Sequence, residues 1–409
     1  MSAPLVEIEE HLAAVLERVR VVEAEPLSVA EARGRILREP VLARVDIPVF
    51  DNSAMDGFAV RFDDLVDGRA VLTVVADVPA GSSDDPALAA GQAARIMTGA
   101  PMPSSADTVV PFEDTAGGLA DSLETAVIER APRGRSAYVR SRGEDLRAGD
   151  PVVEAGLTLT ALSLGAIAAA GAARVVVARR PRIAVVSTGT ELASPDAELA
   201  RGRIPESNSV LLAGLAAEAG ADVVLVRTVA DDGAGVIAAV QAASELAADA
   251  CVFTGGVSAG AYEPVRTGLA SSMAFSRIAM QPGKPQGFGV ADSGMLLFGL
   301  PGNPVSAAVS FEVFVRPALL AMQGASVLAR PALRLPAAIG WRSTAGRRQY
   351  LPAAIDRTDP SRWCVRPATA GGSGSHLAGG LARAEAYAVV PAAIEQVTAG
   401  ELVDVMVVA

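Results

Sequence analysis

The sequence RIAVVSTGTEL (residues 182–192) is an apolar run that ends in a polar loop containing glycine. Similar apolar runs recur at 223–229, 250–254 and 295–298, and helical patterns occur at 209–219, 233–247, 264–271 and 305–320. Strands that alternate with helices favour a parallel sheet between two helix layers, because crossover connections are right-handed. We therefore predict an α/β domain over residues 179–328, with a doubly wound, mostly parallel sheet.

The region before this domain changes character twice. Apolar residues have helical spacing at 7–20, 28–37 and 157–173. This predicts helices on both sides of a central region that lacks helical spacing. In between, short β-like runs at 70–75, 93–97, 108–111 and 125–129 are separated by clusters of Gly, Pro, Ser and Asp. We predict a β-rich domain at 45–146, inserted into a discontinuous, elongated helical domain made of residues 1–44 and 147–178.

The region after the α/β domain again has short strand-like runs joined by turns rich in glycine. These runs lie at 334–339, 349–353, 386–390 and 402–408. They are typical of a small β-barrel, which we place at residues 329–409. The chain is thus predicted to be a multidomain α/β protein with four domains.

The composition excludes several classes of protein. The 409 residues include 35 Lys and Arg against 46 Asp and Glu, and the net charge of −11 repels nucleic-acid phosphates. Two cysteines, Cys251 and Cys364, are too few for a disulfide framework. Only two histidines, His11 and His376, are present. A multi-histidine zinc site is therefore excluded, and a Ser-His-Asp triad could use only these two.

The sequence gives no indication of export or of a membrane. The first ten residues contain Glu7, Glu9 and Glu10 in place of a basic segment, so we expect no export signal. The most apolar stretch, 157–177, is interrupted by Thr, Ser, Gly and Arg174, so we expect no membrane span. Together with the low cysteine count, this predicts a cytoplasmic location.

Three predicted strands of the α/β domain run into loops rich in glycine. The loops are STGTE (187–191), TGGVSAG (254–260) and GLPGNP (299–304). Ligands of open α/β sheets bind at the carboxyl ends of strands, and glycine lets backbone N–H groups approach an anion closely. We predict a phosphate or oxyanion site here. The alternative is that Gly and Pro only form tight turns.

Charged residues lie at the same edge of the predicted sheet. The acids are Glu191, Glu206, Asp231, Asp232 and Glu263, and the bases are Arg266, Arg277 and Lys284. Carboxylates beside phosphates are unfavourable unless a cation lies between them, which suggests Mg²⁺ bridging acids and substrate phosphates. Each acid could instead belong to a helix N-terminus, and Lys284 could be an ordinary surface lysine.

The β-rich region contributes the segments DNSAMDG (51–57) and MTGAP (97–101), and RGED (142–145) follows at its end. Turn formation explains much of these segments. It does not explain the density of side-chain oxygens in 51–57, which exceeds what one turn requires.

In order and spacing, these motifs resemble the molybdopterin molybdenumtransferase family, which includes the MoeA proteins and the gephyrin E domain. The matching segments are FDNSAMDGFA (50–59), RIMTGAP (95–101), RGED (142–145), STGTEL (187–192), GGVS (255–258), PGKP (282–285) and GLPGNP (299–304). The segment GGVS alone would be weak, but seven motifs in order are specific. The resemblance covers essentially the whole chain.

The resemblance implies an elongated homodimer of four-domain subunits. Its active site would lie between the α/β domain of one subunit and the β-rich domain of the other. It implies an enzyme that inserts molybdate into adenylylated molybdopterin with the help of Mg²⁺. The pyrophosphate bond is hydrolysed, AMP leaves, and the dithiolene binds molybdenum to give the molybdenum cofactor.

Site residues follow from the resemblance position by position. It implies catalytic roles for Asp56, Thr98, Asp145, Glu191, Asp231 and Glu263, of which Glu191, Asp231 and Glu263 would also bind Mg²⁺. The substrate-binding residues it implies are Ser187, Thr188, Gly189, Gly255, Gly256, Val257, Ser258, Arg277, Lys284, Pro301, Gly302, Asn303 and Pro304.

Four positions depart from the pattern of the family. Glu263 and Thr190 stand where members often have Asp, and Arg277 and Gln281 stand where they often have Lys. Arg277 keeps a cation whereas Gln281 does not, so Lys284 with Arg277 is the predicted anion-binding pair. Two other functions stay open: a non-catalytic molybdopterin-binding or scaffolding protein, and a different nucleotide-dependent enzyme that shares only the α/β domain.

Overall fold

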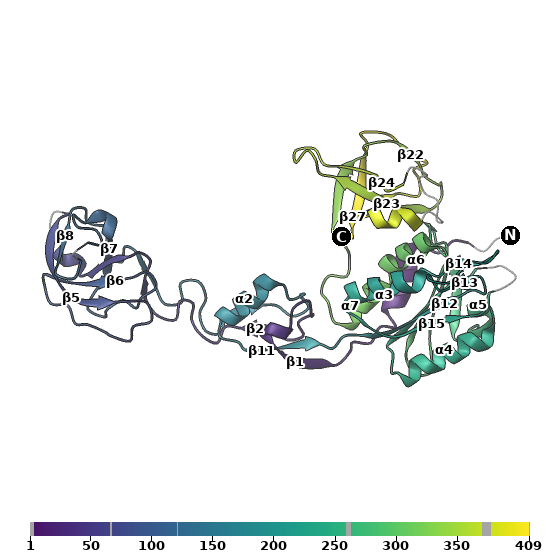
Figure 1. Ribbon diagram of the computed structural model, residues 1–409, viewed down its shortest axis with the longest axis horizontal. Coiled ribbons are helices and arrows are strands. Elements are labelled where there is room, and N and C mark those ends of the chain that lie inside the picture. Colours follow the sequence, from purple (N-terminus) through teal and green to yellow (C-terminus); the bar gives the residue numbers. More distant parts are fainter. Residues whose placement is uncertain (1–3, 66–67, 121, 259–262, 370–377, 409) are drawn as a thin grey trace.

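The computed structural model describes residues 4–65, 68–120, 122–258, 263–369 and 378–408, which form an elongated molecule (Figure 1). An α/β body and the C-terminal β-barrel pack together at one end. A β-rich unit lies at the opposite end, and a narrow connecting region joins the two.

The sheet of the α/β body has six strands in the order β15-β12-β16-β20-β19-β17. The first four strands are parallel, and the last two are antiparallel to their neighbours. The strands are β12 (Arg182–Thr188), β15 (Asp222–Val229), β16 (Ala250–Thr254), β17 (Met273–Arg277), β19 (Pro285–Val290) and β20 (Leu296–Leu300). The prediction of a mostly parallel sheet is confirmed, although β17 and β19 were not predicted.

Helices cover both faces of this sheet, so it is doubly wound. One face carries α1 (Ile8–Leu16), α3 (Asn208–Glu218), α6 (Pro304–Ser310), the π-helical segment Phe311–Val315 and α7 (Arg316–Met322). The other carries α4 (Gly233–Glu245) and α5 (Pro264–Gly268). Val185 and Val186 are fully buried in opposite cores, because successive strand residues point to opposite faces. Burial on both faces explains the uninterrupted apolar run of β12.

One helical stretch of the α/β body is long and apolar enough to cross a membrane by length and composition. It is Pro304–Met322, with 19 residues and a mean hydropathy of 1.5, and 89% of its most apolar window is buried inside the protein. It is therefore the central helix of the core, since Phe311 and Leu319 are fully buried against the sheet.

The connecting region is built from two small antiparallel pairs and one helix. Strand β1 (Ala24–Ser28) pairs with β11 (Arg174–Ala178), and β2 (Val41–Leu42) pairs with β10 (Pro151–Val153). Helix α2 (Ala161–Ala169) begins at a capping box, in which the Thr160 side chain accepts from Ser163 N and the Ser163 hydroxyl accepts from Thr160 N. The prediction of a helix in this second flank is confirmed.

The prediction of a second N-terminal helix at 28–37 is wrong. Only the 3-10 turn Val29–Glu31 is helical there. Val29, Ala32 and Leu37 are buried against residues of α2 and β11, so packing on a sheet rather than helix propensity determines their backbone. The first predicted helix does form as α1, but it packs on α7 of the α/β body rather than in the connecting region.

The β-rich unit has a five-stranded sheet in the order β7-β4-β6-β5-β8. The strands are β4 (Gly57–Val60), β5 (Ala70–Val78), β6 (Gln92–Ile96), β7 (Thr108–Pro111) and β8 (Thr125–Ile128), with the 3-10 turns Phe62–Asp64 and Phe112–Asp114 and the small pair β3 (Asn52–Ser53) and β9 (Val139–Arg140). A Cβ at Gly57 would lie 2.1 Å from the Val110 carbonyl oxygen, so only glycine permits β4 to pair there.

The C-terminal unit closes into a small barrel. Its sheet follows the order β18-β23-β25-β27-β21, β24 pairs with β23, and a bridge between Ala337 and Val365 joins the end of β21 to β24. The strands are β21 (Ala332–Pro336), β23 (Arg348–Asp356), β24 (Cys364–Pro367), β25 (Ala386–Val390) and β27 (Leu402–Val407), with β22 (Trp341–Arg342), β26 (Gln396–Val397) and the 3-10 segment Ala378–Arg383. Strand β18 (Met280–Gln281) comes from the α/β body and pairs with β23, so the two units share a sheet.

Candidate functional site

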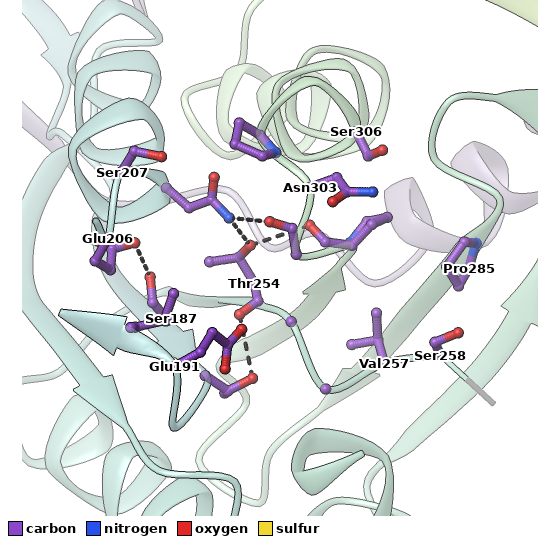
Figure 2. A pocket seen from close by; sticks show the side chains of 18 of the residues that line it. Ser187, Glu191, Glu206, Ser207, Thr254, Val257, Ser258, Pro285, Asn303 and Ser306 are labelled. Atoms are coloured by element: carbon purple, nitrogen blue, oxygen red, sulfur yellow. Dashed lines mark hydrogen bonds between the residues drawn. The ribbon is translucent and has the colours of Figure 1, made fainter. Parts of the chain in front are cut away.

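A cavity of about 1000 Å³ lies at the carboxyl ends of β12, β16 and β20 (Figure 2). Segments of all three predicted glycine loops line it, and so does the short parallel pair β13 (Leu192–Ala193) and β14 (Ile204–Pro205). The predicted substrate-binding residues on its wall are Ser187, Thr188, Gly255, Gly256, Val257, Ser258, Lys284, Pro301, Gly302, Asn303 and Pro304. Gly189 and Arg277 do not line it.

Asn208 holds two of the loops together at the first turn of α3. Its Nδ2 donates to the Thr254 hydroxyl at 2.8 Å and to the Gly302 carbonyl oxygen at 2.6 Å. The Thr254 hydroxyl in turn donates to the Pro301 carbonyl oxygen at 3.2 Å. Because Gly302 offers an acceptor, the orientation of the Asn208 amide is fixed. The loops that follow β16 and β20 are thereby locked to one helix terminus.

Glu206 performs a similar task for the loop that follows β12. Its carboxylate is buried and accepts from the Ser187 hydroxyl at 2.8 Å and from the Ser209 backbone N–H at 2.9 Å, and it also accepts from the Ser209 hydroxyl. Figure 2 shows Glu206 beside Ser187 on the cavity wall. Glu206 thus joins the start of α3 to β12.

The loop after β16 requires glycine. Gly255 has a φ of +90°, and a Cβ there would lie 2.7 Å from both the Thr188 carbonyl oxygen and the Thr188 hydroxyl. Without a side chain, the backbone of this loop forms part of the cavity wall. A wall of backbone amides can bind phosphate oxygens, as predicted for this edge of the sheet.

The three predicted Mg²⁺ ligands line this cavity. Asp231 Oδ2 accepts from the Thr190 backbone N–H and from its hydroxyl, both at 3.0 Å. Glu263 Oε2 accepts from the Ser258 backbone N–H at 2.7 Å, and Glu191 is exposed. Over the described ranges, no three His, Cys, Asp or Glu side chains are grouped to hold a metal ion. The three acids therefore share a cavity without forming a closed metal cage.

Basic side chains gather near the segment that carries Lys284. Lys284 lies on the wall, and its pKa is lowered by desolvation and by the neighbouring charges of Arg277 and Arg347. Arg277 ends β17 and is paired in the sheet with Pro285, which places it beside Lys284 without lining the cavity. The predicted pair of Lys284 and Arg277 is thus brought together, and a third cation joins it.

Comparison with known proteins places this arrangement in one family. Three family models match: the MoeA N-terminal region (domain I and II) over residues 6–171, the probable molybdopterin binding domain over 184–321 and the MoeA C-terminal region (domain IV) over 334–408. Molybdopterin molybdenumtransferase 2 of Mycobacterium tuberculosis is 39% identical over 410 residues, which cover 97% of this chain and 98% of that protein. The chain belongs to the molybdopterin molybdenumtransferase family.

Further comparisons agree. Molybdopterin molybdenumtransferase 1 of M. tuberculosis is 37% identical over 403 residues, covering 93% of each chain. The crystal structure of the molybdopterin biosynthesis MoeA protein from Pyrococcus horikoshii OT3 superposes with a TM-score of 0.84 at 26% identity, over 99% of this chain and 100% of that one. The family predicted from the motifs is confirmed, and so is the prediction of a transferase of molybdenum cofactor biosynthesis.

Three predicted catalytic residues of this molybdopterin molybdenumtransferase lie outside the cavity of their own chain. Asp56 and Thr98 belong to the β-rich unit at the far end of the molecule, and Asp145 belongs to the segment that returns from it. Asp56 Oδ1 accepts from the Thr98 N–H at 2.6 Å and from its hydroxyl at 2.8 Å. These hydrogen bonds lower the pKa of Asp56, which is exposed. Asp145 is also exposed, and its backbone N–H donates to Ile47 O at 2.9 Å.

His11, the histidine within the described residues, lies away from the cavity. His11 is buried on α1, and its ring meets the ring of Phe314 edge-on with a centroid distance of 4.8 Å. Burial lowers the pKa of His11 to about 4. His376 lies outside the described residues. His11 therefore acts in packing.

The sequence did not identify several residues of the site. Asn208, Ser207 and Ser306 line the cavity, and Arg347 donates to Gln281, a cavity residue that the comparison with the family pattern had already singled out. Asn208 and Ser207 stand directly before the helical pattern at 209–219, on the sheet edge where ligands bind, and this position could have indicated them. Nothing in the sequence around Arg347 points to a site more than 60 residues away.

Proposed function

We propose that the chain inserts molybdate into adenylylated molybdopterin, hydrolyses the pyrophosphate bond and releases AMP. The observation that carries this proposal is the cavity of about 1000 Å³, in which glycine loops, carboxylates and a lysine line the same space. Its size suits a large phosphorylated ligand rather than a single small anion. The names of the M. tuberculosis relatives support the same reaction.

The described residues have separate tasks in this reaction. The backbone N–H groups after β16 and β20, held by Asn208, would bind the pyrophosphate oxygens and orient the bond that breaks. Lys284 would offset the charge that develops there. Because these donors are already in place before the reaction, little reorganisation would be needed when the bond breaks.

The carboxylates of the cavity fit a Mg²⁺ ion. Mg²⁺ is usually bound through one or two carboxylates together with substrate phosphates, so a closed protein cage is not required. Glu191 and Asp231 form no ion pair among the described residues, which leaves their oxygens for a hard cation. We propose that Glu191, Asp231 and Glu263 hold it. Once bound, Mg²⁺ would polarise a phosphoryl oxygen.

The cationic end of the cavity would bind molybdate, the second substrate. A tetrahedral dianion needs several donors around it, and Lys284 and Arg277 can supply them. Since Gln281 carries no charge, the cations available there are Lys284 and its neighbours Arg277 and Arg347.

A homodimer would explain the distant residues. Asp56, Thr98 and Asp145 have no place in the cavity of their own chain, so we propose that they complete the cavity of a partner subunit. The connecting region offers apolar surface for such a contact, since Leu162 is 87% exposed and Leu42 and Leu157 are also exposed. We also propose that each subunit is divided into the four predicted domains and that the protein is cytoplasmic.

The test uses the purified full chain with adenylylated molybdopterin, molybdate and Mg²⁺. We expect release of AMP together with active molybdenum cofactor. Binding of the pterin without release of AMP would favour the non-catalytic alternative and overturn the proposal. Sedimentation equilibrium of the same sample measures the dimer separately.

A further inference from the structure

The barrel extends one arginine toward the cavity of the α/β body. Arg347 lies between β22 and β23, and its Nη1 donates to Gln281 Oε1 at 2.6 Å. Gln281 itself lines the cavity, next to the turn that carries Lys284. A residue of the C-terminal unit is thus bonded to the wall of the candidate active site.

The backbone around Arg347 is fixed on both sides. The Gly346 N–H donates to Ala392 O at 2.9 Å within the barrel. The Arg348 N–H donates to Ala279 O at 2.9 Å, and β23 pairs with β18 so that Gln281 stands opposite Gln349. The start of the Arg347 side chain therefore cannot move far relative to Gln281, and only the guanidinium needs a partner to hold it.

Three positively charged side chains are concentrated at this point. Arg277 and Arg347 both lower the pKa of Lys284, which means that the three cations lie near one another. Within the parts of the chain that the structure describes, neither Lys284 nor Arg347 forms an ion pair with a carboxylate. Arg348, one residue further on, is paired with Glu9 at 2.6 Å. The positive charges of Lys284 and Arg347 repel each other, and an anion that binds between them would relieve this repulsion.

We propose that Gln281 is a positioning residue that orients Arg347, so that the barrel contributes a third cation to the oxyanion end of the cavity. This inference rests on the proposed function, since the anion in question is molybdate. A neutral amide oxygen suits the task, because it accepts from the guanidinium without cancelling its charge. A carboxylate at position 281 would neutralise Arg347, and a lysine there would repel it.

The test compares four variants of the full chain. Gln281→Met removes the acceptor at nearly constant volume, Gln281→Glu keeps an acceptor but adds a negative charge, and Arg347→Gln removes the cation. Arg348→Gln is the matched control, because it removes one positive charge from the neighbouring position, where the partner is Glu9. Isothermal titration calorimetry measures molybdate binding, AMP release gives KM for molybdate and kcat, and thermal unfolding reports on stability.

We expect the Kd and KM for molybdate to rise about tenfold in Gln281→Met and in Arg347→Gln, with little change in kcat or melting temperature. The double variant Gln281→Met with Arg347→Gln should be no worse than Arg347→Gln alone, since Gln281 acts through Arg347. Gln281→Glu should weaken molybdate binding although its hydrogen bond remains. Arg348→Gln should bind molybdate like the wild type.

Two failures can be told apart. If the wild type releases no AMP and binds no molybdate, the proposed function is wrong. If the wild type binds molybdate and Gln281→Met binds it equally well, or if the two substitutions have additive effects, the positioning role of Gln281 is wrong while the proposed function stands.

Discussion

Asp56 and Thr98 form a hydrogen-bonded pair in the β-rich unit, at the end of the molecule far from the cavity. One carboxylate oxygen of Asp56 accepts hydrogen bonds from both the backbone N–H and the hydroxyl of Thr98. Two residues 42 positions apart in the chain are thus joined by the pairing of β4 with β6. The pKa of Asp56 lies below its ordinary value because Thr98 donates to its charged form. The carboxylate is therefore ionised at neutral pH and can act as a base or as an electrostatic partner, but not as an acid.

The first prediction concerns this carboxylate. Asp56→Asn keeps the size of the side chain and removes its charge, so we expect AMP release to fall by about 100-fold or more while the melting temperature is unchanged. Asp77→Asn is a control on the same unit, because the Asp77 carboxylate pairs with Arg95 and not with Thr98. If Asp56→Asn and Asp77→Asn release AMP at the wild-type rate, the catalytic role of Asp56 is excluded.

The second prediction concerns the pH dependence of the same group. A carboxyl group with a lowered pKa stays charged until the pH falls through that lowered value. Thr98→Val removes the hydroxyl donor and keeps the backbone donor, so the pKa of Asp56 should rise toward its ordinary value. The charged form is then lost at a higher pH than in the wild type. An NMR titration of the Asp56 carboxyl carbon measures this, and Thr98→Ser, which keeps the hydroxyl, should titrate like the wild type.

The fold could be predicted where a segment is buried on both faces, because the apolar pattern of the segment itself then shows the structure. In β12 each residue from Ile183 to Val186 is fully buried, so the apolar run directly reports a strand covered on both faces. The segment 28–37 misled because its apolar residues have helical spacing, while their partners in α2 and β11 are more than 120 positions away in the chain. Local periodicity contains no information about such partners.

The site was predictable for a related reason. The loops after β12, β16 and β20 meet because parallel strands end at the same sheet edge, so sequence order alone brings Thr188, Gly255 and Pro301 together. Arg347 could not be found in this way, since its place depends on how the barrel pairs with β18. The sequence also could not show how the predicted Mg²⁺ ligands are oriented, because Asp231 accepts from Thr190 and Glu263 accepts from Ser258.

The third prediction concerns acid stability. His11 has a pKa of about 4 in the folded protein against 6.5 as its ordinary value, because burial disfavours the charged ring. Between these values the unfolded chain binds a proton that the folded chain does not, so the free energy of unfolding falls as the pH falls. The loss amounts to at most about 3 kcal/mol.

His11→Phe should remove this part of the acid sensitivity, since a phenyl ring can pack against Phe314 without titrating. The measurement is denaturant unfolding of both proteins at pH 7 and at pH 4.5. Carboxyl groups contribute equally to both proteins, so only the difference between them reports His11. Equal losses of stability in the two proteins would contradict the prediction.

The fourth prediction concerns Asn208, whose side-chain amide donates from the first turn of α3 to both the Thr254 hydroxyl and the Gly302 carbonyl oxygen. Asn208→Ala removes two hydrogen bonds that are nearly inaccessible to water, so we expect the free energy of unfolding to fall by about 1–3 kcal/mol. We also expect the KM for adenylylated molybdopterin to rise, because the loops after β16 and β20 are no longer held at one spacing. Val210→Ala, at an exposed position of the same helix, should change neither quantity appreciably.

The two effects of Asn208→Ala separate structure from positioning. A variant that is less stable but keeps the wild-type KM at a temperature where it is fully folded would mean that the loops hold their spacing without Asn208. Asn208→Asp sharpens the comparison, because it keeps the size of the side chain but places a carboxylate oxygen against the Gly302 carbonyl oxygen, where the amide nitrogen now donates. Repulsion between the two oxygens should push the loops apart, so the KM should rise more in Asn208→Asp than in Asn208→Ala.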